Sequence, residues 1–257
     1  MCIRDRYCDG TALSAALQLY LIRHGETAWS ITGQHTGFTD IALTAHGQEE
    51  AHALASRLAK VQFTRILTSP LRRARQTCEL AGFGAAAKID ADLVEWNYGD
   101  YEGKRTVDIH GERPDWNVWR DGCPHGETPA NVSDRADRLL VRLRELTGNV
   151  ALFTHGQFGS ALGSRWIGLA IIEAQHLALS PASISILAHE AGHPKVPVIA
   201  LWNARADHSL SPQSVSYTHL DVYKRQRLGR CTRIFVNVSS HAGEPTAGRF
   251  GFSTAGR

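Results

Sequence analysis

The chain has 257 residues, of which 43% are hydrophobic and 21% are charged, a balance typical of a globular protein. Its formal net charge of +3 arises in residues 204–257, which hold eight Lys or Arg and three Asp or Glu, so the rest of the chain offers no bulk positive charge. No apolar run reaches the roughly 18 residues of a transmembrane helix. Because the chain has neither such a run nor bulk positive charge outside residues 204–257, we expect neither a membrane nor nucleic acid as a partner.

Both ends of the chain differ from the sequence between them. Residues 1–10 lack a periodic apolar pattern, and the segment SVSYTHLDVYKRQ at 214–226 breaks sharply from what precedes it. Both stretches resemble translated adapter sequence. We therefore interpret residues 1–10 as a non-native leader and 11–204 as the functional domain. Residues 205–257 are interpreted as an artefactual or naturally disordered basic tail, to which we assign no function.

The first half of the domain alternates between strand and helix patterns. Residues 17–22 form a short apolar run that predicts a strand ending at Arg23-His24-Gly25. Thr44 is a favourable helix N-cap, followed by apolar residues at helical spacing up to Leu58. A further strand is predicted over 65–68, and Ser69-Pro70 begins a helix that Gly82 ends.

The second half begins with a segment rich in Trp, Gly and Pro, residues 88–127, predicted to form loops and short helices over one end of a sheet. Thr128-Pro129 then opens a long amphipathic helix that Gly148 closes. The remaining predicted elements are a strand over 149–154, a helix over 157–167, and strands over 183–188 and 196–202.

Strands separated by helices predict an α/β fold, a doubly wound, mostly parallel sheet with helices on both faces. Ligands of such sheets bind beyond the carboxyl ends of the strands. Three segments bring polar residues to that edge: 21–25, 67–70 and 153–156. We therefore expect His24, His155 and the Arg72/Arg73 pair to share one crevice.

Histidines and arginines at one sheet edge indicate an anion site, and phosphate suits the planar fork of arginine. A neutral imidazole is a competent nucleophile toward phosphorus. Arginines beside it would neutralise the transition-state oxygens and disfavour protonation of the ring. A carboxylic acid must then protonate the leaving oxygen. Taken singly, each histidine or arginine is more readily explained as structural or solvated, so the hypothesis depends on their joint arrangement.

Four ordered motifs carry a family resemblance. Residues 21–27 (LIRHGET) resemble the opening signature of the histidine phosphatase superfamily, which includes cofactor-dependent phosphoglycerate mutases. Residues 68–77 (TSPLRRARQT) resemble the second motif of that superfamily. Residues 95–99 (EWNYG) resemble its acid motif, and 154–156 (THG) resemble its closing motif. The resemblance covers about 17–203 and implies a phosphoglycerate mutase-like fold.

The resemblance implies a role for each matching residue. His24 would be phosphorylated, and Glu95 would act as general acid and then as base toward water. Arg73 is preferred over Arg72 because the family places its arginine directly before the alanine of that motif. The implied phosphoryl cradle consists of Arg23, Arg73 and His155, and no metal or organic cofactor is implied.

Two strings indicate the substrate. Residues 29–37 (WSITGQHTG) and 95–103 (EWNYGDYEG) resemble the sugar-phosphatase branch, including sedoheptulose-bisphosphatase-like enzymes. Thr36 and Gly37 are candidate hydroxyl and backbone donors to the phosphate, although Gly37 is equally explained by a plain turn. Tyr98, Gln34 and Gln157 are candidate substrate contacts.

We therefore predict a metal-independent phosphomonoesterase that acts through a phosphohistidine on a sugar phosphate or similar small metabolite. A mutase is an alternative, but three departures from the family pattern disfavour it. The segment 116–128 is brief and has Arg120 as its one arginine. Ser30 stands where the family has Asn, and Thr106 stands where mutases carry lysine. A phosphatase for protein phosphohistidine and a non-catalytic phosphate-binding module are further alternatives. The long 88–127 segment disfavours the former, and the intact motif residues disfavour the latter.

Cysteine usage bears on the compartment. The five cysteines show neither a CxxC pair nor zinc spacing, and an odd count does not suggest a disulfide framework. The simplest interpretation is a reducing compartment, the cytoplasm. The basic and apolar start of the chain imitates a signal peptide, but it runs directly into Arg23-His24. The expected partner is a small-molecule phosphate ester, and the oligomeric state stays open.

Overall fold

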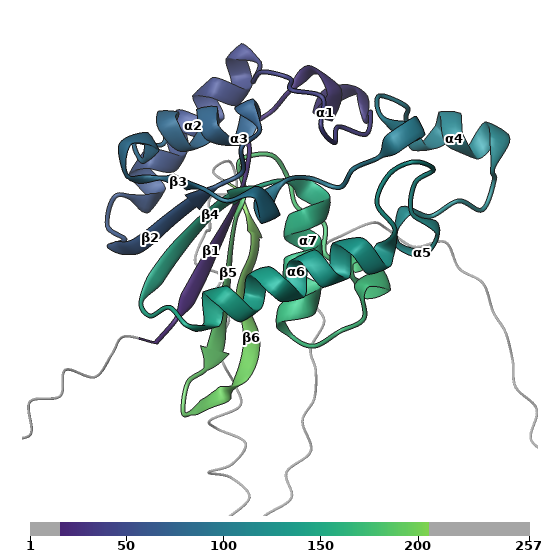
Figure 1. Cartoon of the computed structure of the whole chain (residues 1–257). Coiled ribbons are helices and arrows are strands. Elements are labelled where there is room, and N and C mark those ends of the chain that lie inside the picture. The colour runs from purple at the N-terminus through teal and green to yellow at the C-terminus, as the bar shows by residue number, and fades with distance from the viewer. Residues whose placement is uncertain (1–15, 206–257) are drawn as a thin grey trace, which may run out of the picture. The chain divides into compact units, whose positions relative to one another are not determined.

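The computed structural model describes residues 16–205, so the interpretations of residues 1–10 and of the tail beyond 205 lie outside the described residues. Within this range the strands form one sheet in the order β3-β2-β4-β1-β5-β6 (Figure 1). The strands are β1 (Gln18–Arg23), β2 (Phe63–Thr68), β3 (Lys88–Ile89), β4 (Asn149–Thr154), β5 (Ile184–Glu190) and β6 (His193–Ala204).

Seven α-helices are found in the described range. They are α1 (Ala28–Thr32), α2 (Ala45–Leu58), α3 (Arg72–Leu80), α4 (Thr106–Glu112), α5 (Val118–Asp121), α6 (Pro129–Arg144) and α7 (Gly156–Trp166). Short 3-10 helices add η1 (Gly84–Ala86), η2 (Ala91–Leu93), η3 (Gly99–Tyr101) and η4 (Ile171–His176). No helix of residues 16–205 is both long and apolar enough to cross a bilayer.

The sheet is mostly parallel, as predicted. β3, β2, β4 and β1 pair in parallel, whereas β5 pairs antiparallel with β1 and β6 pairs antiparallel with β5. The antiparallel edge follows from the short connection between β5 and β6, since a parallel pair needs a crossover of about a dozen residues or more. The sequence pattern did not predict this hairpin, because β6 begins at His193, whereas the apolar run that predicted the strand begins at residue 196.

Helices cover both faces of the sheet, which confirms the doubly wound prediction. Alternate residues of a strand point to opposite faces. Leu21 and Leu152 belong to a core shared with α6 and α7, whereas Ile22 and Phe153 belong to a second core shared with α2 and α3. Figure 1 shows these two helix pairs on opposite sides of the strands.

Helix starts agree with the capping signals except at α3. Thr44 Oγ1 accepts the Gly47 N–H at 2.9 Å, and Thr128 caps α6 with Pro129 in the first turn. The helix predicted from Ser69-Pro70 instead begins at Arg72, whose N–H donates to Asp40 Oδ1 at 2.6 Å. A side chain distant in sequence therefore caps α3, which local patterns do not reveal.

Two glycines let the loop after β1 lie directly against the first turn of α2. A Cβ atom on Gly25 would lie 2.3 Å from the Gly47 carbonyl oxygen, and one on Gly47 would lie 2.1 Å from the Glu26 carbonyl oxygen. Neither contact is possible for a side chain, and both opposing atoms are backbone. The position of the His24 loop thus depends on two residues without side chains.

We expect Gly47→Ala to lower the free energy of unfolding by about 1–3 kcal/mol, because two backbone segments must move apart. Helix propensity alone predicts the opposite sign, since alanine is favoured over glycine inside a helix. Urea unfolding of the two proteins measures the difference.

Gly111→Ala is the matched control. Gly111 also lies in a helix and is exposed, and a Cβ atom added there would meet no neighbouring atom within 4 Å. This variant should lose no stability and gain up to about 1 kcal/mol. Equal stabilisation by both substitutions would show that the Gly25–Gly47 contact does not constrain the fold.

Candidate active site

His24 and His155 lie side by side because β1 and β4 are parallel and in register. Arg23, the last residue of β1, pairs with Thr154, the last residue of β4. A histidine follows each, and the two ring centroids are 5.3 Å apart. The His24 N–H donates to the Thr154 carbonyl at 3.0 Å, which extends the pairing beyond β1. Strand register therefore builds the histidine pair at the carboxyl edge of the sheet.

The loop that follows β1 orients the His24 ring. Nδ1 lies 2.8 Å from the Gly25 carbonyl oxygen, which can only accept a hydrogen bond, so the neutral ring carries its proton on Nδ1 and its lone pair on Nε2. Burial and the positive charges of Arg73 and Arg23 lower the pKa of His24 well below its usual 6.5. His24 is therefore a neutral imidazole with an unprotonated Nε2 near neutral pH.

His155 is held by the residue that follows β2. Its Nε2 lies 2.8 Å from Ser69 Oγ, which also accepts the Leu71 N–H at 3.3 Å. The Ser69 hydroxyl proton is therefore available to Nε2, which leaves the proton of the neutral ring on Nδ1. Burial and the charge of Arg73 lower the pKa of His155 well below 6.5. The hydrogen bond with Ser69 therefore leaves the Nδ1–H of His155 as a buried donor.

Arg73 is completely buried and ties down the segment after α1. It donates from Nη1 to the Thr39 carbonyl at 3.1 Å and from Nη2 to the carbonyls of Thr36 and Gly37 at 2.9 and 2.8 Å. Arg72, its neighbour, is exposed. The structure thus brings the preferred arginine of the pair to the histidines and leaves the other in solvent.

Several donors at this edge are buried without a partner. Arg23 donates from Nη1 to the Leu179 carbonyl, but its Nε has no hydrogen-bond partner among the described residues. The same holds for Arg73 Nε and His155 Nδ1. An unpartnered buried donor is costly, so their concentration beside His24 indicates a site for an oxyanion.

Glu95 reaches the site through the start of α7. Its Oε1 accepts the N–H groups of Trp96 and Phe158 at 2.9 and 2.8 Å, and its Oε2 accepts that of Gln157 at 3.0 Å. His155, the N-cap residue of α7, provides no side-chain cap, so the Glu95 carboxylate takes that place. The acid and the second histidine are thus joined through one helix terminus.

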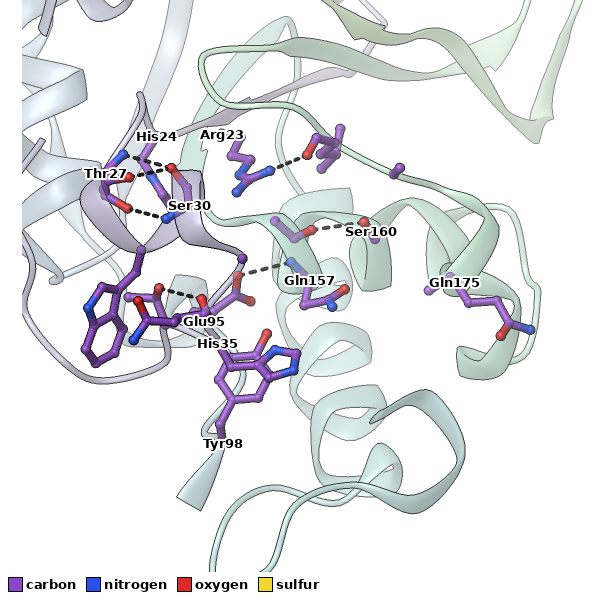
Figure 2. A pocket seen from close by; sticks show the side chains of 18 of the residues that line it. Arg23, His24, Thr27, Ser30, His35, Glu95, Tyr98, Gln157, Ser160 and Gln175 are labelled. Carbon is purple, nitrogen blue, oxygen red and sulfur yellow. Dashed lines mark hydrogen bonds between the residues drawn. The ribbon is translucent and has the colours of Figure 1, made fainter. Parts of the chain in front are cut away.

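A cavity of about 400 Å³ opens over this edge (Figure 2). Arg73 and His155 are fully buried and do not line it. The cavity is lined by these predicted site residues: Arg23, His24, Gln34, Thr36, Glu95, Tyr98 and Gln157.

Gly37 and Gln34 both form hydrogen bonds within the chain, and of the two only Gln34 lines the cavity. Gly37 does not line the cavity, and its N–H donates to Glu102 Oε1 at 2.8 Å, so it is not a donor to a bound phosphate in this arrangement. The Gln34 carboxamide accepts from Thr32 at 2.6 Å and donates to the Gly103 carbonyl at 2.8 Å. The Gly37 N–H is thus engaged within the loop, whereas the Gln34 amide nitrogen has a second N–H besides the one that donates to Gly103.

The other predicted contacts, Tyr98, Gln157 and Thr36, also line the cavity. Tyr98 is 3% exposed, and burial and the Glu95 charge raise its pKa well above 10, so the phenol keeps its proton. The Gln157 carboxamide has no hydrogen-bond partner among residues 16–205 and lies beside Glu95 in Figure 2. The Thr36 hydroxyl donates to the Gln34 carbonyl at 3.2 Å.

Metal-ligating side chains are not grouped in the described part of the chain. No cluster of three or more His, Cys, Asp or Glu in residues 16–205 is arranged to hold a metal ion. Positive charge at the site comes from the guanidinium groups of Arg23 and Arg73, which can bind phosphate oxygens directly.

Sequence reasoning missed a buried ion pair that holds the acid motif. Arg135 forms a two-point contact with Glu127, both N–O distances being 2.9 Å, and donates to the carbonyls of Asp92 and Val94 at 2.9 and 2.8 Å. Glu127 Oε2 accepts the Asn97 N–H at 2.8 Å. The pair thereby fixes the backbone on both sides of Glu95. A signal existed, because Arg135 stands among the apolar positions of α6.

Ser69 and the Gly25–Gly47 contact were also missed as site features. Ser69 lies in the second motif but was considered only as a helix start. The glycine contact joins segments 22 residues apart, and no local pattern marks it.

Comparison with known proteins finds relatives over most of the described residues. The profile of the Histidine phosphatase superfamily (branch 1) matches residues 19–204. An acid phosphatase of Mycobacterium tuberculosis is 39% identical over 188 residues, which is 72% of this chain and 92% of that protein. Sedoheptulose 1,7-bisphosphatase of Saccharomyces cerevisiae is 36% identical, over 59% of this chain and 68% of that protein. The α-ribazole phosphatase structure from Shigella flexneri has a TM-score of 0.65 and 30% identity, covering 74% of this chain and 97% of that one.

We expect Arg135→Ala to lower the free energy of unfolding by about 3 kcal/mol, because it leaves the largely buried Glu127 carboxylate without its cation. The Glu127 side chain is 19% exposed. Replacing both residues by apolar ones, as in Arg135→Met with Glu127→Leu, should restore part of the loss. Urea unfolding followed by tryptophan fluorescence measures all three proteins.

Arg138→Ala is the control on the same helix. Arg138 is 57% exposed and pairs with Asp92 at 2.7 Å, so its loss should cost no more than about 1 kcal/mol. Similar losses for Arg135→Ala and Arg138→Ala would contradict the structural role given to the buried pair.

Proposed function

The chain belongs to branch 1 of the histidine phosphatase superfamily and is a phosphoric monoester hydrolase of that family; we propose that it hydrolyses phosphate esters of small metabolites through a phosphohistidine on His24. One observation carries this proposal. An imidazole held neutral, with its lone pair on Nε2, stands beside the buried unpartnered donors of Arg23, Arg73 and His155.

In the first step the His24 Nε2 lone pair attacks phosphorus. The bond from phosphorus to the ester oxygen breaks, and its electron pair leaves with that oxygen, which takes a proton from Glu95. In the second step Glu95 takes a proton from water as the water oxygen attacks phosphorus. The P–N bond breaks, inorganic phosphate leaves, and Nε2 regains its lone pair.

Arg23, Arg73 and His155 stabilise the charge on the transferring group. Two guanidinium groups and the His155 Nδ1–H would donate to its oxygens, and these donors are already positioned before reaction. Arg73 acts twice, because its charge also lowers the pKa of His24 and so keeps the nucleophile unprotonated.

The substrate proposal is supported by the relatives and by the cavity. The similar proteins are named for action on phosphate esters of small molecules, sedoheptulose bisphosphate and α-ribazole phosphate among them. The cavity of about 400 Å³ is large enough for a metabolite of that size. The resemblance implies a lysine in mutases at the position of Thr106, which contacts His35 at 3.3 Å, and the lack of that positive charge supports hydrolysis over the mutase alternative. The cytoplasmic location stays a prediction.

We expect the full-length protein in EDTA to release phosphate from sugar phosphates, and His24→Ala to reduce kcat by roughly 10³-fold or more. The loss follows because His24 supplies the lone pair that bonds to phosphorus. Phosphate release across a panel of sugar phosphates and phosphoglycerates measures it. Brief reaction with labelled ester should leave an acid-labile phosphoryl group on the wild-type protein.

His52→Ala, at an exposed histidine of α2, is the control and should behave as wild type. If His24→Ala retains wild-type activity, the phosphohistidine mechanism is wrong. Interconversion of phosphoglycerate isomers without phosphate release would instead identify a mutase. Loss of activity in EDTA that returns with a divalent cation would overturn the prediction of metal independence.

We expect Arg73→Met to move the acidic limb of the kcat/KM profile to higher pH. Burial and the two arginines lower the pKa of His24, so the neutral nucleophile persists well below pH 6.5 in the wild type. Removing one positive charge raises that pKa, so the nucleophile becomes protonated at a higher pH. The kcat/KM of the variant, divided by that of the wild type at the same pH, should therefore be lower at about pH 5 than at about pH 8, which lie below and above the ordinary pKa of histidine.

Arg72→Met provides the matched control, since the two arginines are neighbours on α3 and Arg72 is exposed. Its pH profile should overlay that of the wild type. An acidic limb that stays in place in Arg73→Met would show that Arg73 does not control the protonation of His24.

A further inference from the structure

The cavity has a charged end and an uncharged end. Among its described lining residues, Arg23 and Glu95 alone belong to the residue types that are charged at neutral pH apart from histidine. Burial lowers the pKa of His35 to about 4, so that side chain is neutral as well. The rest of the lining is aromatic, amide or small, with Trp29, Tyr98, Trp119 and Gln175 as examples.

Charge balance at the reactive end leaves nothing to attract a second anion. Arg23 and Arg73 supply two positive charges. A dianionic phosphoryl group beside His24 offsets both, so the reactive end has no positive charge left over. A further phosphate or carboxylate in the cavity would meet like charge without a cation to offset it.

Cations next to the lining are already engaged. Gln34 lines the cavity and forms a bridge with Arg105, but the Arg105 guanidinium pairs with Asp108 at 2.7 and 2.8 Å. Arg120, which follows Trp119 in α5, pairs with Asp121 at 2.8 and 2.9 Å. Each guanidinium therefore already has a carboxylate partner that offsets its positive charge.

Aromatic side chains contribute to the lining of the uncharged end, among them Trp29 and His35, which are partly exposed. His35 lies over Tyr98 with ring centroids 4.6 Å apart, and Trp116 contacts it edge-on at 5.4 Å. Aromatic faces pack well against rings, and the unpartnered Gln157 carboxamide can exchange hydrogen bonds with hydroxyl groups. Leu179 adds an apolar contact.

We propose that the alcohol part of the substrate is an uncharged ring compound, so that the enzyme prefers monophosphates of neutral cyclic alcohols to bisphosphates and to phosphorylated carboxylic acids. This inference rests on the proposed function, because it places the phosphoryl group at His24. It also separates this chain from a bisphosphatase, a function toward which part of its sequence resemblance points.

Binding to full-length His24→Ala tests the proposal without turnover. Fructose 6-phosphate and fructose 1,6-bisphosphate share a ring and differ by one phosphate. Glucose 1-phosphate and glucuronic acid 1-phosphate share a ring and differ by a carboxylate in place of a hydroxymethyl group. We expect titration calorimetry to give at least about tenfold tighter binding of the first member of each pair. Equal or tighter binding of the more anionic member, or no measurable binding of either sugar phosphate, would overturn the proposal.

Substitution at the uncharged end gives a second test. Gln175 lies on η4, and its Oε1 accepts from Asn117 at 3.0 Å. Gln175→Lys should narrow the preference for fructose 6-phosphate over the bisphosphate by about tenfold, because it supplies the missing cation. Gln175→Met loses the same hydrogen bond without adding charge and should leave the preference unchanged. An unchanged preference in both variants would contradict the electrostatic argument.

The two proposals fail in different ways. If phosphate release does not depend on His24 but the binding order holds, the reaction proposed here is wrong and the neutral-ring preference stands. If release depends on His24 and kcat/KM is highest for bisphosphates or phosphoglycerates, the reaction stands and the preference is wrong.

Discussion

The site depends on the parallel, in-register pairing of β1 with β4. That pairing sets Arg23 opposite Thr154, so the next residue of each strand delivers a histidine to the same point. A shift of one residue would turn one histidine to the opposite face of the sheet. The placement of the two histidines is therefore a consequence of the same hydrogen bonds and two-sided core that hold the sheet together.

Burying the polar side chains of the site costs desolvation free energy, which hydrogen bonds and the charges of other groups offset. Arg73 and His155 are fully buried, and desolvation lowers the pKa of both. The charge of Glu95 favours the protonated arginines, and carbonyl groups accept from Arg73. Three donors stay without a partner among the described residues. An oxyanion would satisfy them, so binding energy at this site comes largely from groups that the folded chain leaves unsatisfied.

The elements that local patterns specify were predicted well. Thr44 and Thr128 marked helix starts through side-chain caps, and strand β4 was placed at its observed bounds. The features that were missed depend on contacts across the chain. Arg135 donates to the carbonyl of Asp92, 43 residues away, and Asp40 caps α3 from a position 32 residues before Arg72. The roles of Gly37 and Gln34 depended on loop hydrogen bonds that residue type does not specify.

The two ends of the cavity are supported by different parts of the chain. The carboxyl edge of the sheet and the start of α7 position the charged end of the cavity, where His24 and Glu95 lie. The uncharged end comes from the segment before the second strand, the irregular region after β3, and η4, as His35, Trp119 and Gln175 show. Tyr98 joins the two, because it follows Glu95 by three residues and stacks on His35. Side chains at the outer end can therefore change without disturbing the register of β1 and β4. On this reasoning the substrate preference of the chain is decided by the charge and shape of its outer wall, while the reaction is decided by the sheet.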